Sequence, residues 1–171
     1  KKKKNKQEEN GFKLDIEQAD KLCSKLEEEA DKIVKDLQEI FPPIITERYS
    51  DKTGKRLDDS VEEFNPNSRQ QISKRLIEKG WKPENLTPTG HPIVDEGTLK
   101  RIKDIPEAQQ IAHYLLLQKR VSQIKSWIEV VQEDGKVHGR VMTLKAISGR
   151  MAHNSPNMAQ VPASYSPYGK E

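Results

Sequence analysis

The chain has 171 residues, of which 33% are hydrophobic and 33% are charged, with 30 Lys and Arg against 27 Asp and Glu. This composition excludes two large domains and a thick apolar interior, and it predicts helices that each bury one face. The formal charge of +3 is too small to identify a polyanionic partner by itself. Apolar runs of the roughly 18 residues that a membrane span needs do not occur, so no membrane partner is expected.

The N-terminal part of the chain predicts a lead-in and one long helix. Residues 1–10, which begin with KKKKNK, are predicted to be a basic flexible lead-in. Over residues 15–41 apolar or small residues recur three and four positions apart, which predicts a helix that two prolines end. Cys23 lies in this pattern and is interpreted as a reduced core residue. A coiled coil is the alternative interpretation of this helix alone.

The middle of the chain predicts a loop and two short helices. Residues 42–66 are expected to form an irregular, exposed connection, because DKTGKRLDD mixes opposite charges around a glycine. A short basic helix is predicted over 67–80, where Ser68 and Gln71 have the spacing of a capping box and Gly80 is placed as a C-terminal stop. The segment DEGTLKRI predicts one or two further helical turns.

A second long helix and a β segment are predicted toward the C-terminus. Apolar spacing indicates a helix over 106–131, and Pro106 suits its first position. The EDGK segment at 133–136 predicts a tight turn, and the alternation in KVHGRVM predicts a short strand. The expected fold class is therefore mainly α, with two long antiparallel helices, short helices and a small β segment near the C-terminus.

Catalytic or metal-binding residue sets are not recognisable in the sequence. The four histidines are scattered without the spacing of a zinc site, and each is expected to be solvated or locally bonded. The chain carries neither a glycine-rich phosphate loop nor a nucleophile elbow. Most acidic residues lie in Glu- and Lys-rich stretches that are typical of a solvated helix face. No set of residues in the sequence therefore supports a hydrolase activity.

The segment NPNSRQ is the clearest candidate for phosphate binding. Asn67, Ser68 and Arg69 begin a predicted helix, where free backbone amides, the helix dipole, a hydroxyl and a guanidinium can meet one phosphate. An ordinary capped surface helix is the alternative. Lys119 on the second long helix is equally compatible with a solvated helix face.

The motifs occur in an order that is specific as a set. From residue 10 to 171 the chain carries NGFKLD, FNPNSRQQISKRLIEKGW, TPTGHPIVDEGTLKRI, YLLLQKRVSQI, DGKVHGRV, SGRMAHNSPNMAQVP and SPYG. This order resembles the thumb and the first part of the palm of family A DNA polymerases, most closely the phage replicative branch. The resemblance implies an α+β thumb and palm fragment, in which 11–132 is a helical thumb with its tip helix at 67–80, and 133–171 begins the palm.

The resemblance also assigns roles to individual residues. The block SGR…PNMAQVP is similar to the family's TGR…PNLQNIP, which runs beside the minor groove of the primer-template, although Ser148 and Met158-Ala159 depart from that pattern. It implies that Arg150 donates to minor-groove acceptors and that Asn157 and Gln160 contact the duplex or position their neighbours. Minor-groove acceptors occur on every base pair, so such contacts sense duplex geometry without reading sequence. Contacts to the DNA backbone are implied for Asn67, Ser68, Arg69 and Lys119.

As a whole, the resemblance implies the primer-template-binding part of a DNA-directed DNA polymerase. The chain ends before the family's metal-binding aspartates, so catalytic residues and cofactors are not expected within it, and alone it is expected to bind duplex DNA without synthesis. Mg²⁺ and the remaining palm and fingers, from the same gene or a separate chain, are expected in the complete polymerase. The expected location is the cytoplasm, that of a bacterial host if a phage encodes the chain.

Two further interpretations concern protein partners. The connection 42–66 is too short for the long thumb insertion with which some phage polymerases bind a processivity partner, so that partner is not assumed. The alternative to DNA binding is a helical protein–protein interaction module, in which the basic residues serve only solubility.

Overall fold

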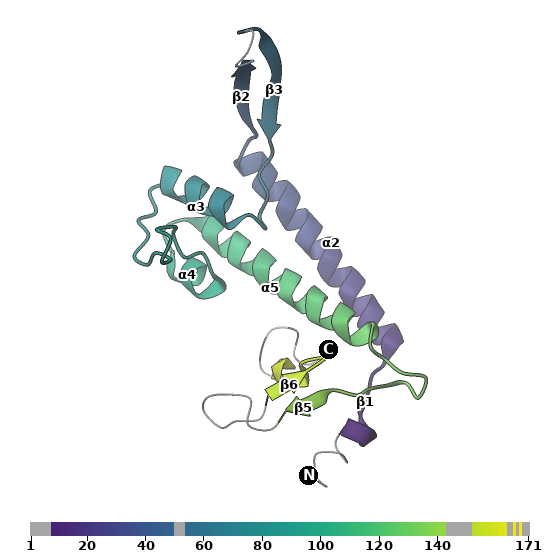
Figure 1. Cartoon of the computed structure of the whole chain (residues 1–171). Coiled ribbons are helices and arrows are strands. Elements are labelled where there is room, and N and C mark those ends of the chain that lie inside the picture. Colours follow the sequence, from purple (N-terminus) through teal and green to yellow (C-terminus); the bar gives the residue numbers. More distant parts are fainter. Residues whose placement is uncertain (1–7, 50–53, 143–151, 164–165, 167, 169–171) are drawn as a thin grey trace. The chain divides into compact units, whose positions relative to one another are not determined.

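The protein is described by a computed structural model over residues 8–49, 54–142, 152–163, 166 and 168 (Figure 1). Two compact units divide the chain: residues 27–119 form one, and residues 1–26 together with 120–171 form the other. Most of the predicted lead-in lies outside the described residues. Among the described residues every helix is too short or too polar to cross a bilayer.

Two long helices are present close to their predicted bounds. Helix α2 covers Ile16–Ile40 and helix α5 covers Pro106–Ile128. Within the unit 27–119, the C-terminal part of α2 and the N-terminal part of α5 share one buried cluster, so these parts run antiparallel as predicted. Cys23 is buried, as expected for a core residue.

The unit 27–119 is built around this one apolar cluster. Two short helices close it, α3 at Arg69–Glu78 and α4 at Glu96–Arg101, both at predicted positions. Helix α3 contributes Ile72 and Leu76, which are fully buried one helical turn apart. The buried members are Leu37, Phe41, Phe64, Ile72, Leu76, Val94, Leu99, Ile105, Ala108, Ile111 and Ala112.

The two short helices are capped by side chains. Ser68 Oγ accepts the amide of Gln71 at 3.4 Å, but the Gln71 side chain accepts the amide of Asn65 at 2.6 Å, so the predicted capping box is only half formed. Asp95 Oδ1 accepts the amide of Thr98 at 2.6 Å at the start of α4, and this bond lowers the pKa of the Asp95 carboxyl. Gly80, with a φ of 98°, follows α3 as predicted.

The prediction of an irregular connection over 42–66 was wrong. Strands β2 (Ile44–Tyr49) and β3 (Arg56–Glu62) pair antiparallel and project from the end of α2 (Figure 1). Isoleucine, threonine, tyrosine and valine supply the β propensity, whereas the exposure of almost every residue leaves no alternation of apolar and polar positions. The pattern of mixed charges is therefore the same as that of an exposed loop.

The second unit holds two small sheets. Strand β1 (Phe12–Lys13) pairs with β4 (Lys136–Val137), and β5 (Arg140–Met142) pairs with β6 (Ala152–Asn154), which a 3₁₀ helix at Met158–Gln160 follows. The single strand predicted for KVHGRVM is therefore wrong, because its two halves belong to different sheets. The predicted turn in EDGK is present: the amide of Gly135 donates to Gln132 O at 2.9 Å.

His138 joins the two ends of the second unit. Its Nδ1 lies 2.7 Å from the carbonyl oxygen of Glu8, and its Nε2 lies 3.0 Å from Asp134 Oδ2. Both neighbours are acceptors, so only the protonated ring can donate to both. The Glu8 carbonyl and then the Asp134 carboxylate raise the pKa of His138, and the bond from His138 lowers the pKa of Asp134. This histidine is locally bonded, one of the two states expected for it.

The His138 bridge should make the stability of the chain depend on pH. Because the folded pKa of His138 is raised, its contribution is complete below the unfolded pKa and is lost as pH rises through the folded value. The Asp134 contribution, from a lowered pKa, is lost only as pH falls through that lowered value. Urea unfolding at about pH 5.5 and about pH 9 should therefore show a larger loss of stability in the wild type than in His138→Gln. Equal losses in the two proteins would contradict the bridge.

Candidate nucleic-acid interface

A tight turn sets the start of helix α3. The side chain of Asn65 accepts the amide of Asn67 at 2.9 Å, and the Asn65 carbonyl accepts the amide of Ser68 at 2.9 Å. Pro66 between them is buried. Ser68 has extended backbone angles, φ −84° and ψ 105°, as an N-cap residue requires. The turn therefore directs the chain into α3 with its first amides at the surface.

Two backbone amides at this helix start remain for an external acceptor. The amide of Ile72 donates to the carbonyl of Ser68, and the amide of Gln71 donates to the Ser68 hydroxyl. Within the described part of the chain, the amides of Arg69 and Gln70 have no hydrogen-bond acceptor. Both lie at the positive end of the helix dipole, which favours an anion.

A buried tyrosine positions the side chain of Asn67. Asn67 Nδ2 donates to Tyr114 Oη at 2.9 Å, and Tyr114 lies on the buried face of α5. Burial raises the pKa of the Tyr114 hydroxyl, so it stays neutral and can accept this bond. Tyr114 was not predicted from the sequence, because a hydrophobic pattern identifies a buried position but not the polar partner of its hydroxyl.

Arg69 has a structural contact in addition to its predicted role. One of its guanidinium nitrogens donates to the carbonyl of Val94, in the segment before α4. It is also one of the smaller influences that lower the pKa of Asp95. Arg69 is nevertheless exposed, and a guanidinium has five N–H donors. The carbonyl contact fixes the side chain and leaves other donors for an anion.

Lys119 lies on a different side of α5 from this cluster. It is exposed and follows Tyr114 by five residues, which corresponds to about 140° around the helix axis. The structure therefore brings Asn67, Ser68 and Arg69 together at the start of α3, whereas Lys119 does not join them.

The remaining predicted site residues belong to the second unit. Asn157 and Gln160 are exposed, and the Gln160 carbonyl accepts from Gln123 Nε2 of α5 at 3.2 Å. Arg120 donates to Gln123 Oε1 at 2.9 Å and so supports this contact. Arg150 lies outside the described residues. Over the described ranges, no group of three or more His, Cys, Asp or Glu side chains is placed to hold a metal ion.

Comparison with known proteins decides the family. The family model for DNA polymerase family A matches residues 20–171. The chain belongs to DNA polymerase family A. Its resemblance to that family, inferred from the order of its motifs, is thereby confirmed.

Relatives of this family A chain include two phage enzymes and a solved structure. The DNA-directed DNA polymerases of Enterobacteria phage T3 and Escherichia phage T7 are each 44% identical to it over 117 residues. That match covers 63% of the chain but only 17% of each relative's length. A structure of the POL domain of Pol1 from M. smegmatis, in complex with DNA primer-template and dNTP, matches 96% of the chain and 26% of its own length, with a TM-score of 0.76 and 15% identity. At that identity the likeness shows the fold.

The bond between Asn67 and Tyr114 can be measured by a double-mutant cycle. Tyr114→Phe should lower the free energy of unfolding by about 1 kcal/mol, because the Asn67 amide loses its acceptor. Asn67→Ala should cost a similar amount, and the double variant should cost much less than the sum of both. Chemical denaturation of the four proteins measures these values. Strictly additive losses would show that the bond does not form in solution.

Proposed function

We propose that this chain is the primer-template-binding part of a family A DNA polymerase, with residues 11–132 as thumb and 133–171 as the start of the palm. The observation that carries the proposal is the start of α3, where the amides of Arg69 and Gln70 are left for an external acceptor beside the Ser68 hydroxyl and the Arg69 guanidinium. This arrangement supports binding of a backbone phosphate of the product duplex.

Such a contact suits a polymerase because it carries no sequence information. A phosphate is present at every nucleotide, so a clamp made of amides, a hydroxyl and a cation can hold any duplex as it moves. Asn67 lies at the same turn, and its side-chain amide is held in place by the hydrogen bond to Tyr114. Lys119, on another side of α5, supplies a separate phosphate contact in this proposal.

The second unit supplies the minor-groove contacts in the same proposal. Asn157 and Gln160 are exposed and their amide side chains can donate to the acceptors that every base pair presents there. Arg150 is included by its match to the family motif. Together these residues contact a correctly paired primer end better than a mispaired one, because their contacts depend on the shape of the minor groove.

Synthesis is assigned to the complete polymerase. The phage relatives are described as DNA-directed DNA polymerases, and this chain spans 17% of their length. In the proposal, the remaining palm and fingers hold Mg²⁺ and perform nucleotidyl transfer, and this chain presents the primer-template to them. The cytoplasm of a bacterial host is the proposed place of action.

DNA binding can be tested by fluorescence anisotropy of a labelled duplex over a range of salt concentrations. The logarithm of the affinity should fall linearly with the logarithm of salt, by about 0.9 for each phosphate neutralised. Arg69→Gln should reduce that slope by about 1, whereas Lys103→Gln, which removes an exposed charge distant from the start of α3 in sequence, should leave it unchanged. Unfolding of Arg69→Gln should be measured in parallel, because Arg69 also bonds to Val94.

Absence of affinity for duplex DNA at low salt would contradict the proposal. A stable dimer of the chain under the same conditions would then favour a helical protein–protein interaction module. An equal change of slope in Arg69→Gln and Lys103→Gln would show that binding follows total charge and not the start of α3.

A further inference from the structure

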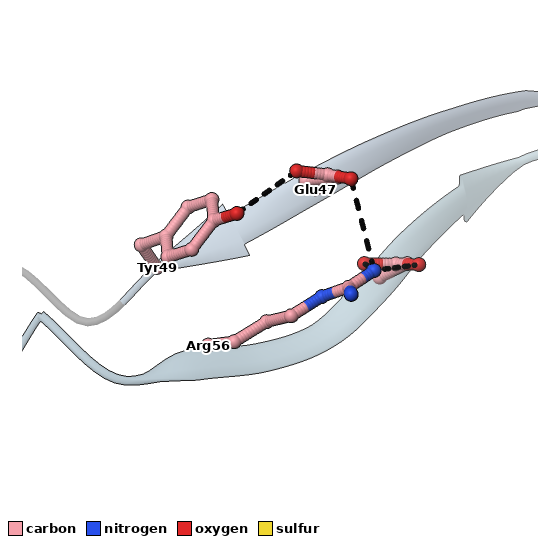
Figure 2. Close-up of polar contacts among 4 residues, drawn as sticks. Glu47, Tyr49 and Arg56 are labelled. Carbon is pink, nitrogen blue, oxygen red and sulfur yellow. Dashed lines mark hydrogen bonds and ion pairs between the residues drawn. The ribbon is translucent and has the colours of Figure 1, made fainter.

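Polar contacts between side chains differ in what they can position. Figure 2 shows such contacts on the hairpin of β2 and β3: Tyr49 Oη donates to Glu47 at 2.9 Å, and Arg56 lies 3.7 Å from the other oxygen of Glu47. The three side chains are exposed, so solvent competes for each contact. Each contact also joins two residues of the hairpin, so this network orders only the hairpin itself.

A second network joins helix α5 to the segment PNMAQ, residues 156–160. Gln123 of α5 donates from Nε2 to the carbonyl of Gln160 at 3.2 Å, and its Oε1 accepts from Arg120 at 2.9 Å. Both α5 side chains are half-buried, and all three residues belong to the same compact unit. A glutamine amide has one donating and one accepting end, so the bond from Arg120 fixes which end faces Gln160.

Arg120 is not explained by stability alone. Its Nε is buried and has no hydrogen-bond acceptor within the described part of the chain. An enclosed donor without an acceptor lowers the stability of the folded chain. What the guanidinium does provide is the bond from its other nitrogen, which holds Gln123 in one orientation.

The PNMAQ segment presents its two exposed amide side chains together. The backbone amide of Gln160 donates to the carbonyl of Asn157 at 3.5 Å, which is the bond of a 3₁₀ turn. Side chains three residues apart lie on the same side of such a turn. Pro156 is buried, whereas Asn157 and Gln160 are exposed. A hold on the Gln160 carbonyl therefore influences the direction of both amides.

Gly139 restrains the same segment from the connection between β4 and β5. A Cβ atom at Gly139 would lie 3.0 Å from Met158 Cγ and 3.3 Å from the carbonyl oxygen of Pro156. Both distances are shorter than ordinary van der Waals contacts, so the close approach depends on glycine. The PNMAQ segment is thus held by a hydrogen bond from α5 and by a backbone contact at Gly139.

We propose that Gln123, oriented by Arg120, and Gly139 are positioning residues that hold Asn157 and Gln160 in the conformation that fits the minor groove of a paired primer end. They act without touching DNA. A restrained segment loses less freedom on binding, and it cannot follow acceptors that a mispair displaces. The restraint therefore increases the preference for a paired primer end. This inference rests on the proposed function.

The test measures the affinity of the full chain for two primer-templates that differ only in a paired or mispaired primer 3′ end. Fluorescence anisotropy gives the ratio of the two affinities. Gln123→Glu keeps the shape and can pair with Arg120, but its carboxylate cannot donate to the Gln160 carbonyl. It should lower the ratio about fivefold, the factor that corresponds to one hydrogen bond of about 1 kcal/mol.

The control for the added charge is Ser122→Glu, at the neighbouring exposed residue of α5. It places the same charge on the helix and leaves Gln123 intact, so it should change both affinities alike and keep the wild-type ratio. Gln123→Met, which removes the donor without adding charge, should lower the ratio as Gln123→Glu does.

A glycine pair tests the backbone contact. Gly139→Ala should lower the ratio, because the new methyl group displaces Met158 or the Pro156 carbonyl. Gly97→Ala is the matched control: its Cβ would lie 3.5 Å from Asp95 Oδ1, an ordinary contact, and the ratio should equal that of the wild type.

The ¹H–¹⁵N spectrum of the DNA-free chain separates positioning from a general loss of structure. The amide of Val161 shares a peptide plane with the Gln160 carbonyl, so its signal should shift in Gln123→Glu. The signals of Arg69 and Gln70, in the other compact unit, should stay in place. Shifts of all three signals would show a general disturbance of the fold and would contradict a positioning role.

The outcomes separate this inference from the proposed function. If the wild type binds both primer-templates equally, or if Gln160→Ala keeps the wild-type ratio, the proposed minor-groove contact is wrong, and this inference with it. If Gln160→Ala lowers the ratio but the Gln123 and Gly139 variants do not, only the positioning proposal fails. A loss in Ser122→Glu as large as in Gln123→Glu would also overturn it.

Discussion

Burial of Ile72 and Leu76 is the constraint on which the candidate interface depends. Helix α3 has ten residues, and an isolated helix of that length is marginal in water. It persists because these two side chains enter the apolar cluster with Leu37 and Ile111 of the long helices. Each fully buried aliphatic side chain of this size contributes about 2–3 kcal/mol relative to exposure. The apolar contact therefore fixes the direction of α3 and places its first turn at the surface.

Polar contacts then fix individual side chains at the start of α3, whose place is set by the apolar contact. Tyr114 accepts from Asn67, and the carbonyl of Val94 accepts from Arg69, so α5 and the segment before α4 each hold one side chain of the turn. Both contacts restrict side chains that would otherwise lose rotamer freedom when a ligand binds. In the proposed function the phosphate site is therefore preorganised, because the protein bears part of the ordering cost during folding. Gln71 extends the same ordering to the base of the hairpin.

The elements that were predictable from the sequence are those whose burial leaves a periodic record. Apolar spacing predicts the two long helices, α2 and α5. The short helix α3 is predicted by Ser68 as its cap and Gly80 as its stop, and α4 was predicted as one or two helical turns. The hairpin was not predictable in that way, because almost all of its residues are exposed and opposite charges alternate with β-forming residues. The division of KVHGRVM between two sheets depends on pairing with β1 and β6, which local pattern does not encode.

For the site, the sequence identified which residues stand at the helix start but not their partners. Asn67, Ser68 and Arg69 could be named from capping chemistry and from family resemblance. Tyr114, the carbonyl of Val94 and the role of Gln123 beneath Gln160 come from contacts between distant segments. The separation of five residues between Tyr114 and Lys119 places Lys119 on another side of α5, and helix periodicity is enough to predict this.

The most direct measurement is the ¹H–¹⁵N NMR spectrum of the chain titrated with duplex DNA. We expect the amide signals of Arg69 and Gln70 to move downfield, and their protons to exchange more slowly with solvent, on binding, because a phosphate becomes their acceptor. The amide of Ile72, already bonded to the carbonyl of Ser68, serves as the internal reference. If DNA binds while the signals of Arg69 and Gln70 stay where they are, the start of α3 is not the phosphate site and the account is wrong.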